Sequence, residues 1–216
     1  MARMYNPRAT LGLDIGASTG ELTDLFSKKL SIEFVGIEPI ASEVKSQQSK
    51  AQILYGWAND MPFNDESFDI VTFCSVYEHI QPEERLATLK EIARVLKTDG
   101  LLLCQIPNMY FPIEFHSLLP LQQFLPRAIG DPYARILALT PWPHKLGMDW
   151  FRIGPRHIVK DAQESGLEPL QVSALKYFRS EVPKYVRPFT ALLSVLPVGF
   201  KLCFRKKRHK DLISSR

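Results

Sequence analysis

The sequence has few of the features that mark secreted, metal-binding or membrane-spanning proteins. Its three cysteines (Cys74, Cys104 and Cys203) are odd in number and scattered, and each lies in an apolar run. No Cys or His spacing is typical of a zinc site, so we expect no bound metal and three free thiols in a reducing compartment. The first residues contain no apolar stretch typical of a signal peptide. We therefore expect a cytoplasmic protein.

A large excess of charge of one sign is also missing. Lys and Arg number 27 against 23 Asp and Glu, and six basic or potentially basic residues lie together at 205–210. The excess thus belongs to a basic tail (residues 205–216), which argues against nucleic acid as a partner. The apolar stretch before the tail is too short and interrupted to span a membrane. Residues 188–210 predict a peripheral contact with an anionic membrane; the simpler alternative is a core helix, a last strand and a solvated tail.

The composition and the order of elements predict one domain over residues 1–216. The chain is 45% hydrophobic and 23% charged, which is ordinary for a globular protein. Short apolar runs alternate with segments of helical spacing, which predicts an α/β, Rossmann-like, doubly wound and mostly parallel sheet. We expect its strands at residues 11–15, 34–37, 53–55, 68–74, 101–105, 170–174 and 199–205, and helices at 19–29, 41–50, in the 80s to 90s, and at 156–164.

The alternation stops between the fifth and sixth expected strands. Residues 107–150 contain seven of the 16 prolines and two of the three tryptophans. The pattern predicts short amphipathic helices at Phe115–Phe124 and Tyr133–Leu139 between proline breaks. We interpret residues 107–150 as a helical insertion after strand five that covers a substrate. The alternative is a helical pad that only completes the core.

The stretch Leu11–Glu21 carries the first functional signal. Leu11 to Ile15 is typical of a buried parallel strand, and Gly16 and Gly20 then permit a tight turn with close approach by a ligand. Ser18 and Glu21 have the spacing of a capping box, which predicts a helix start. A strand, a glycine turn and a helix start together form a nucleotide-type cradle at the carboxyl end of a strand.

Asp14 and Glu38 indicate which kind of nucleotide this cradle would bind. Ser18 and Glu21 occupy positions where a dinucleotide fingerprint needs glycine. Asp14 would repel a polyphosphate but suits a cationic amino group. Glu38 lies 18 residues after Gly20, the distance at which a carboxylate accepts from ribose hydroxyls. An adenosine that carries an amino acid and no phosphate satisfies both acids.

A set of further motifs follows in order along the chain. They are Asp14–Gly20, Gly36–Glu38, Gly56–Phe63, Ser67–Val71, Glu78–His79 and Glu91–Lys97. With these motifs the chain resembles the class I S-adenosylmethionine-dependent methyltransferases, of the small-molecule type 11 kind, from Leu11 to about Pro107. The resemblance implies a seven-stranded sheet, a last antiparallel strand and S-adenosylmethionine as the cofactor.

The resemblance also implies which residues contact the cofactor. The methionine part would lie near the glycine turn and near the corner Cys74–His79, the ribose near the end of the second strand, and the adenine near the loop after the third. The residues are Asp14, Gly16, Ser18, Gly20, Glu38, Pro39, Trp57, Ala58, Asn59 and Ser75.

The chain departs from the family pattern at two places. Members usually have Asp-Ala where this chain has Trp57-Ala58, and an indole cannot accept from the adenine amino group. Trp57 could stack on adenine, Asn59 or Asp60 could supply the acceptor, or Trp57 could be an ordinary half-buried aromatic. Residues 74–79 also lack the Asx-Pro-Pro-Tyr-like motif of the branches that modify nucleobases or protein amides.

Candidate catalytic residues are fewer. Glu114 and His116 lie two apart beside aromatic residues in the insertion, where His116 could take a proton from a hydroxyl or phenol. The alternative is a surface pair on an amphipathic helix. His79 is a second candidate base or substrate contact, and its alternative is a helix-entry histidine bonded to backbone.

These observations predict methyl transfer from S-adenosylmethionine to a small-molecule or lipid-like acceptor, with O- or C-methylation favoured. One alternative is an NAD or nucleotide-sugar oxidoreductase of similar fold. The other is a non-catalytic member of the fold that binds a partner, because Trp57 departs from the pattern and only ten residues precede the first expected strand.

Overall fold

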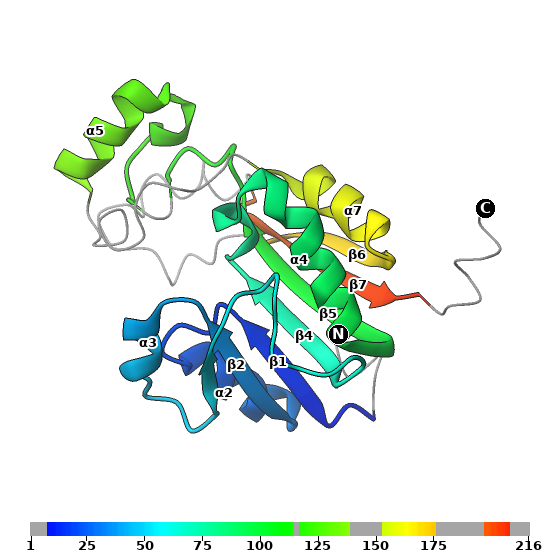
Figure 1. The fold of residues 1–216 in the computed structure, drawn as a ribbon. Coiled ribbons are helices and arrows are strands. Elements are labelled where there is room, and N and C mark those ends of the chain that lie inside the picture. Colours follow the sequence, from blue (N-terminus) through cyan, green and yellow to red (C-terminus); the bar gives the residue numbers. More distant parts are fainter. Residues whose placement is uncertain (1–7, 115–116, 139–152, 176–196, 208–216) are drawn as a thin grey trace.

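Seven strands form one mixed sheet in the order β3-β2-β1-β4-β5-β7-β6 (Figure 1). This computed structural model describes residues 8–114, 117–138, 153–175 and 197–207. The strands are β1 (Leu11–Ile15), β2 (Glu33–Glu38), β3 (Ile53–Tyr55), β4 (Phe68–Cys74), β5 (Leu96–Pro107), β6 (Leu167–Leu175) and β7 (Gly199–Lys206). All pairs are parallel except those of β7, which runs antiparallel to both neighbours. The predicted mostly parallel sheet with a last antiparallel strand is confirmed.

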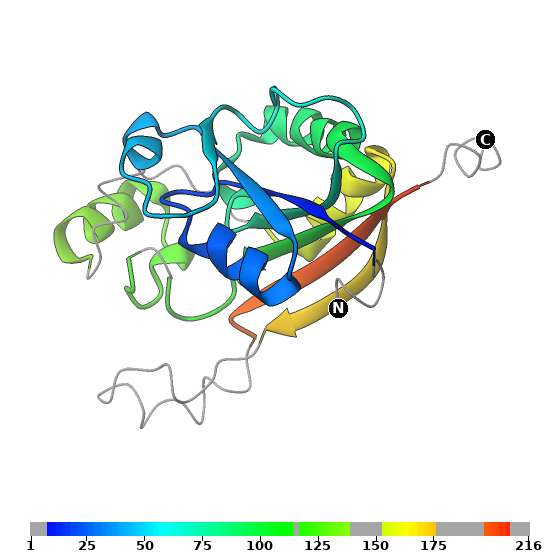
Figure 2. The ribbon, with the colours of Figure 1, turned by 90° about the horizontal axis from the view of Figure 1, so that it is seen from below.

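Helices cover both faces of the sheet. They are α2 (Glu21–Leu30), α3 (Ala41–Lys45), α4 (Pro82–Val95), α5 (Arg127–Leu137) and α7 (Pro155–Glu164), with 3-10 turns η1 (Tyr77–His79) and η2 (Gln122–Phe124). Helices α4 and α7 lie against one face, and α2 lies against the other (Figure 2). Pro82 occupies the first turn of α4, where its missing donor costs nothing.

Two hydrophobic clusters fill these layers. The larger joins the α4 and α7 side, where Leu89, Ile92 and Ile158 are fully buried. The smaller lies on the α2 side, where Phe26 packs on the buried Phe34. Because the central strands are buried on both faces, their sequences read as continuous apolar runs rather than alternating ones.

The strand order of the sheet reverses at β1, and in open α/β sheets a crevice is expected at the carboxyl ends of the strands at such a reversal. Strand β1 pairs with β2 on one side and with β4 on the other, so the strand order reverses there. Ligands of open α/β sheets bind at such a switch point. Asp14 lies in register with Gly36 of β2 and Thr72 of β4, which places the end of β1 at this crevice.

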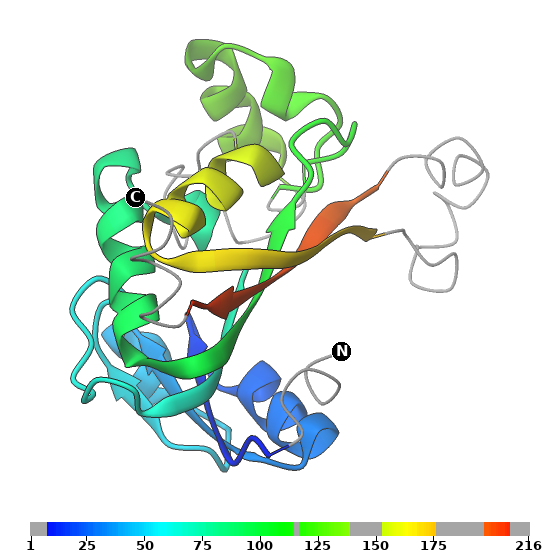
Figure 3. The same cartoon turned by 90° about the vertical axis from the view of Figure 1, so that its right-hand side faces the viewer.

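Of the insertion (residues 107–150) the structure describes 107–114 and 117–138. This part follows β5 and lies beyond the carboxyl end of that strand (Figure 3). Trp142, His144 and Trp150 lie outside the described residues.

Both predicted helices of the insertion need correction. The segment predicted as a helix at 115–124 contains instead a bridge from Ile113 to Pro120 and the short η2. The second helix begins at Arg127 and carries Pro132 inside it, whereas we expected it to begin after that proline. Pro132 is the sixth residue of α5, so the helix loses the hydrogen bond that an N–H there would donate to Ala128 O, although the fixed φ of proline is helical.

The other boundaries differ by a few residues. Strand β5 begins at Leu96, five residues before the predicted start at 101, with an irregular register after Phe68 of its neighbour. Helix α3 ends at Lys45, five residues early. No helix among the described residues is long and apolar enough to cross a bilayer.

Candidate functional site

The turn after β1 depends on its two glycines. Gly16 and Gly20 have φ of +73° and +90°, which side-chain-bearing residues rarely adopt. A Cβ on Gly16 would lie 2.4 Å from Val76 Cγ2, and one on Gly20 would lie 2.2 Å from Ser49 Cβ. The turn is tight, as predicted, but it packs between the segment after β4 and the segment before β3, so the close approach at these two glycines is by Val76 and Ser49 and not by a ligand.

The predicted capping box is wrong. Gly20, not Ser18, is the N-cap of α2, and no side chain caps the helix. Ser18 has φ of +49°, and its hydroxyl donates to Glu43 Oε2 at 3.1 Å. Its backbone N–H donates to Glu38 Oε2 at 2.8 Å. Ser18 thus links the turn to the end of β2 instead of starting the helix.

Asp14, at the end of β1, is buried and held by two hydroxyls. Thr23 of α2 donates to Oδ2 at 2.7 Å, and Thr72 of β4 donates to Oδ1 at 2.6 Å. Burial raises the pKa of this carboxyl above its ordinary value, against the effect of the two hydroxyl bonds, and the charge of Glu38 adds to the rise. Asp14 and Glu38 are therefore near enough to influence each other.

Glu38, at the end of β2, is the second buried carboxylate. Besides Ser18, the N–H of Ile40 donates to its Oε1 at 3.0 Å, and Pro39 forms the turn between them. Burial raises the pKa of Glu38, although the two backbone N–H groups oppose the rise. A carboxylate has about four acceptor positions, so two remain for hydroxyl donors.

The backbone donors of the turn are largely used within the protein. The N–H groups of Gly16 and Ala17 both donate to Ile37 O, at 2.9 and 3.1 Å, and Gly20 N–H donates to Ala17 O. With the N–H of Ser18 bonded to Glu38, these amides are not free to bind a pyrophosphate. The residues fit a cationic ligand without phosphate and do not fit a dinucleotide.

The loop after β3 is hydrogen-bonded to Glu38 at the end of β2. Gly56 N–H donates to Glu38 O at 3.1 Å, and Asp60 N–H donates to Trp57 O at 3.2 Å. The Trp57 side chain is 57% exposed, Asn59 is exposed, and Ala58 packs in part on the core. The loop after β3 is therefore bonded to the end of β2, next to Glu38.

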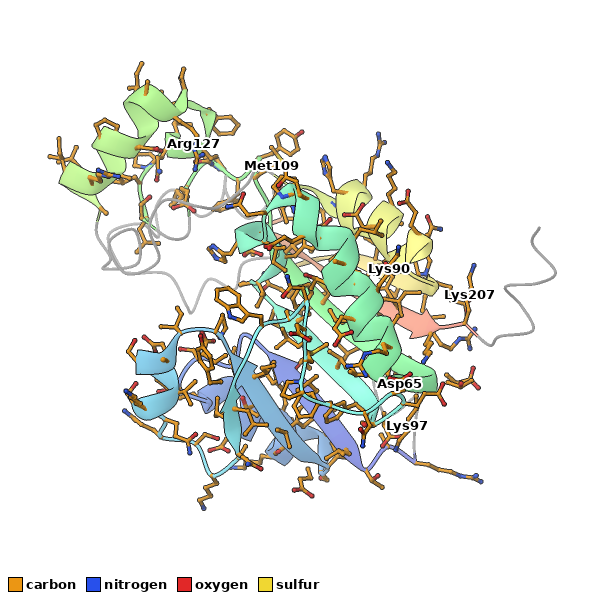
Figure 4. All side chains as sticks on the ribbon, in the orientation of Figure 1. Asp65, Lys90, Lys97, Met109, Arg127 and Lys207 are labelled. Atoms are coloured by element: carbon orange, nitrogen blue, oxygen red, sulfur yellow. The ribbon has the colours of Figure 1, made fainter. Side chains whose placement is uncertain are left out.

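An anchor that we did not predict holds the same loop from α4. Glu91 Oε1 accepts the N–H of Met61 at 2.9 Å, and Arg94 donates to the carbonyls of Phe63 and Met61 at 2.8 and 3.2 Å. Arg94 also pairs with Glu91 and Asp65, each at 2.6 Å. Figure 4 shows Asp65 beside the C-terminal end of α4. The motif Glu91–Lys97 carried this signal, because its acid and its arginine are three apart on one helix face.

The corner after β4 faces the glycine turn. Ser75 has φ of +55°, its N–H donates to Gln105 O at 2.9 Å, and its hydroxyl donates to Gln105 Oε1 at 2.7 Å. Burial raises the pKa of the Cys74 thiol to about 12, with the charge of Asp14 the next cause. Cys74 is therefore neutral near pH 7 and close to Asp14.

His79, the remaining candidate of this corner, is held by its backbone. The N–H of His79 donates to Val76 O at 2.9 Å within η1. Beside it, the fully buried Tyr77 donates to Asp161 Oδ2 of α7 at 2.5 Å, and Arg85 lies over its ring at 5.0 Å. These contacts fix η1 at the mouth of the crevice.

Glu114 is buried in the insertion, and its Oε2 accepts the N–H of Ser117 at 2.7 Å. This bond supports the turn between Ile113 and Pro120. His116, its proposed partner, lies outside the described residues. Among the residues that the structure describes, no three His, Cys, Asp or Glu side chains are grouped so as to hold a metal ion.

Comparison with known proteins agrees with this geometry. Residues 13–104 match the family model described as a methyltransferase domain. The chain is 28% identical to ajmaline N-methyltransferase of Rauvolfia serpentina, over 93% of this chain and 72% of that protein. It is 25% identical to demethylmenaquinone methyltransferase of Bacillus licheniformis, over 93% and 83%. A SAM-dependent methyltransferase from Archaeoglobus fulgidus has a similar fold, with a TM-score of 0.62 at 18% identity over 94% and 89%.

Proposed function

Because residues 13–104 match the methyltransferase domain family, we propose that this chain is a class I S-adenosylmethionine-dependent methyltransferase and that it methylates a small, largely apolar or lipid-like acceptor. The observation that carries the proposal is the pair of buried carboxylates at neighbouring strand ends, Asp14 and Glu38, joined by a turn whose amides are occupied. S-adenosylmethionine supplies a methyl group on a positively charged sulfur, which is already a strong electrophile.

The residues at the crevice would hold the cofactor from several sides. Asp14 binds the amino group of its methionine part, with Gly16, Ser18 and Gly20 beside it and Ser75 at the facing corner. Glu38 accepts from the ribose hydroxyls, and Pro39 fixes its backbone. Trp57 stacks on the adenine, while Ala58 and Asn59 line its edge. In this arrangement the protein works by positioning and by exclusion of water.

The insertion supports an apolar acceptor. Among the described residues, 12 large hydrophobic side chains are exposed. Six of them lie between residues 118 and 137: Leu118, Leu121, Phe124, Ile129, Ile136 and Leu137. Exposed apolar groups concentrated on one segment are typical of a surface that binds an apolar ligand or partner. The two curated relatives methylate small molecules according to their names.

A base is needed only if the acceptor must lose a proton. His116 with Glu114, or His79, would take that proton from a hydroxyl, and an acceptor that is already ionised would need neither. The proposed membrane contact through residues 188–210 is a separate part of this proposal. Of that segment the structure describes 197–207, where Arg205 pairs with Glu168 and Lys206 pairs with Glu66. The part available to a membrane surface would therefore lie outside these two residues.

Calorimetry with S-adenosylmethionine, its demethylated product and NAD tests the cofactor assignment. We expect binding of the first two and none of NAD; failure of both to bind would overturn the proposal. Release of the demethylated product is then measured with a panel of phenols, quinols and tertiary amines, and with each compound in vesicles. We expect turnover with apolar members of the panel, and turnover confined to highly polar acceptors would contradict the acceptor class.

A further inference from the structure

Asp14 is held by buried threonine hydroxyls that come from two different elements. We propose that Thr23 of α2 and Thr72 of β4 are positioning residues that aim the Asp14 carboxylate at the amino group of the cofactor. The inference rests on the proposed function, because it needs Asp14 to bind that amino group.

The geometry fixes the carboxylate in one orientation. Thr23 Oγ1 lies 2.7 Å from Oδ2 and Thr72 Oγ1 lies 2.6 Å from Oδ1, so rotation of the carboxylate plane breaks both bonds. Both threonines are fully buried, so water cannot replace either hydroxyl. Each carboxylate oxygen keeps one further acceptor position. An ammonium group can therefore bind while both hydroxyls stay in place.

The hydroxyl of Thr72 has two possible acceptors, Asp14 Oδ1 and Leu13 O. Its hydroxyl also lies 3.3 Å from Leu13 O, but a hydroxyl has one proton. The contact with Asp14 is 0.7 Å shorter (3.3 − 2.6), so the proton belongs there. Thr72 thereby ties β4 to the carboxylate of β1, beyond the backbone bonds between these strands.

The two hydroxyls also favour the ionised form of Asp14. Burial is the largest influence on this carboxyl and raises its pKa, while the bonds from Thr72 and then Thr23 lower it. The titratable groups that act on it are Glu38 of β2, whose charge raises the pKa further, and Cys74 of β4, which is neutral near pH 7. Loss of either hydroxyl raises the pKa of Asp14, so the carboxylate forms only at higher pH.

The test is the pH dependence of cofactor affinity. S-adenosylmethionine binding is measured by calorimetry between pH 5.0 and 7.5, below the usual pKa of about 7.7–8.0 of an α-amino group. Thr23→Val and Thr72→Val keep the shape of the side chain and remove its donor. Thr23→Ser and Thr72→Ser keep the donor. Asp14→Asn and Asp14→Asn/Thr72→Val show whether the effect of the hydroxyl passes through the carboxylate.

We expect each valine variant to bind roughly tenfold more weakly than wild type at pH 5.5, with the ratio shrinking toward pH 7.5, as loss of a bond to a charged group implies. The serine variants should follow the wild-type curve. In the Asp14→Asn background, Thr72→Val should add little. Thr23→Cys and Thr72→Cys, which have a weak donor and similar volume, give the same comparison should a valine variant not fold.

The outcomes separate the two proposals. Wild-type protein that does not bind S-adenosylmethionine at any pH overturns the proposed function. Wild-type protein that binds, with Thr72→Val that loses the same factor in the Asp14→Asn background as in wild type, overturns the positioning role alone. In that case the threonines serve only the stability of the fold.

Discussion

The backbone N–H of Ser18 donates to Glu38 Oε2 at 2.8 Å, so the acid at the end of β2 holds the glycine turn that follows β1. The same carboxylate accepts the N–H of Ile40 through its other oxygen. Glu38 therefore connects two neighbouring strand ends before any ligand binds. Glu38, which we propose to bind the ribose, thus also stabilises the fold.

Glu38→Gln should lower both the stability of the fold and the affinity for the cofactor. Glutamine offers one acceptor oxygen, so either Ser18 or Ile40 would face an amide donor at its N–H. An unsatisfied buried donor costs about 1–3 kcal/mol, and a protein of this size loses roughly 2–4 °C of melting temperature for each kcal/mol. We expect a lower melting temperature and at least tenfold weaker cofactor binding, since a charged acceptor for the ribose is lost.

Differential scanning fluorimetry and calorimetry measure the two effects. Glu33→Gln is the matched control, because Glu33 is an exposed acid at the other end of the same strand. An unchanged cofactor affinity in Glu38→Gln, with a lowered melting temperature, would leave Glu38 with its structural role only.

Asp14→Asn should change how stability depends on pH. Burial raises the pKa of Asp14 above its ordinary value of 3.8. The folded state then holds a proton that the unfolded state has lost, so the stabilising contribution is fully present below pH 3.8 and is lost as pH rises through the folded value. Asparagine removes this loss and can still bond with both threonines, by accepting from one and donating to the other.

The free energy of unfolding, measured with urea between pH 4.5 and 7.5, should therefore fall less steeply with pH in Asp14→Asn than in wild type. At pH 7 the variant should be at least as stable as wild type, yet bind the cofactor more weakly. A residue that lowers stability in return for binding is typical of a functional site. A steeper fall, or a less stable variant at pH 7, would contradict a buried ionised Asp14.

Arg94→Met tests the anchor of the loop after β3. The variant loses the donors to Phe63 O and Met61 O and the pairs with Glu91 and Asp65. Arg94 is partly exposed, so we expect a loss of about 2 kcal/mol, or roughly 4–8 °C in melting temperature. Cofactor affinity should fall less than in Glu38→Gln, because the anchor acts four residues after Trp57.

Lys90→Met on the same helix is the control, since Lys90 is an exposed cation (Figure 4). A melting temperature of Arg94→Met equal to that of Lys90→Met would show that the loop does not depend on the anchor.

The sequence predicts most of the sheet and the positions of both carboxylates. Buried parallel strands read as apolar runs, and the predicted third and fourth strands agree with β3 and β4 residue by residue. Glycine spacing marked the turn because only glycine adopts the φ of Gly16 and Gly20 without strain. These features depend on local sequence, which is why they could be found there.

What the sequence did not reveal depends on contacts between distant segments. Ser18 had the spacing of a cap, but its N–H donates to Glu38 at the end of β2 and its hydroxyl donates to Glu43 of α3, and neither acid is near it in sequence. Thr23 and Thr72 looked like ordinary strand and helix residues until the fold placed both beside Asp14. In the insertion, Pro132 was a misleading signal, because α5 continues through it with the loss of one internal hydrogen bond.

Trp57 replaces the acid that the family pattern has in the adenine position, and its side chain offers the last test. The indole is 57% exposed, while the turn made by Asp60 N–H and Trp57 O fixes its backbone. Stacking of a base on an aromatic side chain is worth about 1–3 kcal/mol. Trp57→Ala should therefore bind S-adenosylmethionine roughly fivefold to a hundredfold more weakly, and Trp57→Phe should retain most of the affinity.

The melting temperature without cofactor should stay unchanged in both variants, because an exposed side chain contributes little to folding. Tyr55→Ala is the control, since Tyr55 is another exposed aromatic, two residues earlier at the end of β3. Asn59→Ala and Asp60→Ala distinguish the alternative: if they lose affinity while Trp57→Ala does not, adenine is recognised by a hydrogen-bond acceptor of this loop. A loss confined to Trp57→Ala instead means that adenine is bound by stacking on the face of its ring and not by a hydrogen bond at its edge. Such stacking retains adenine binding but makes it less selective among bases.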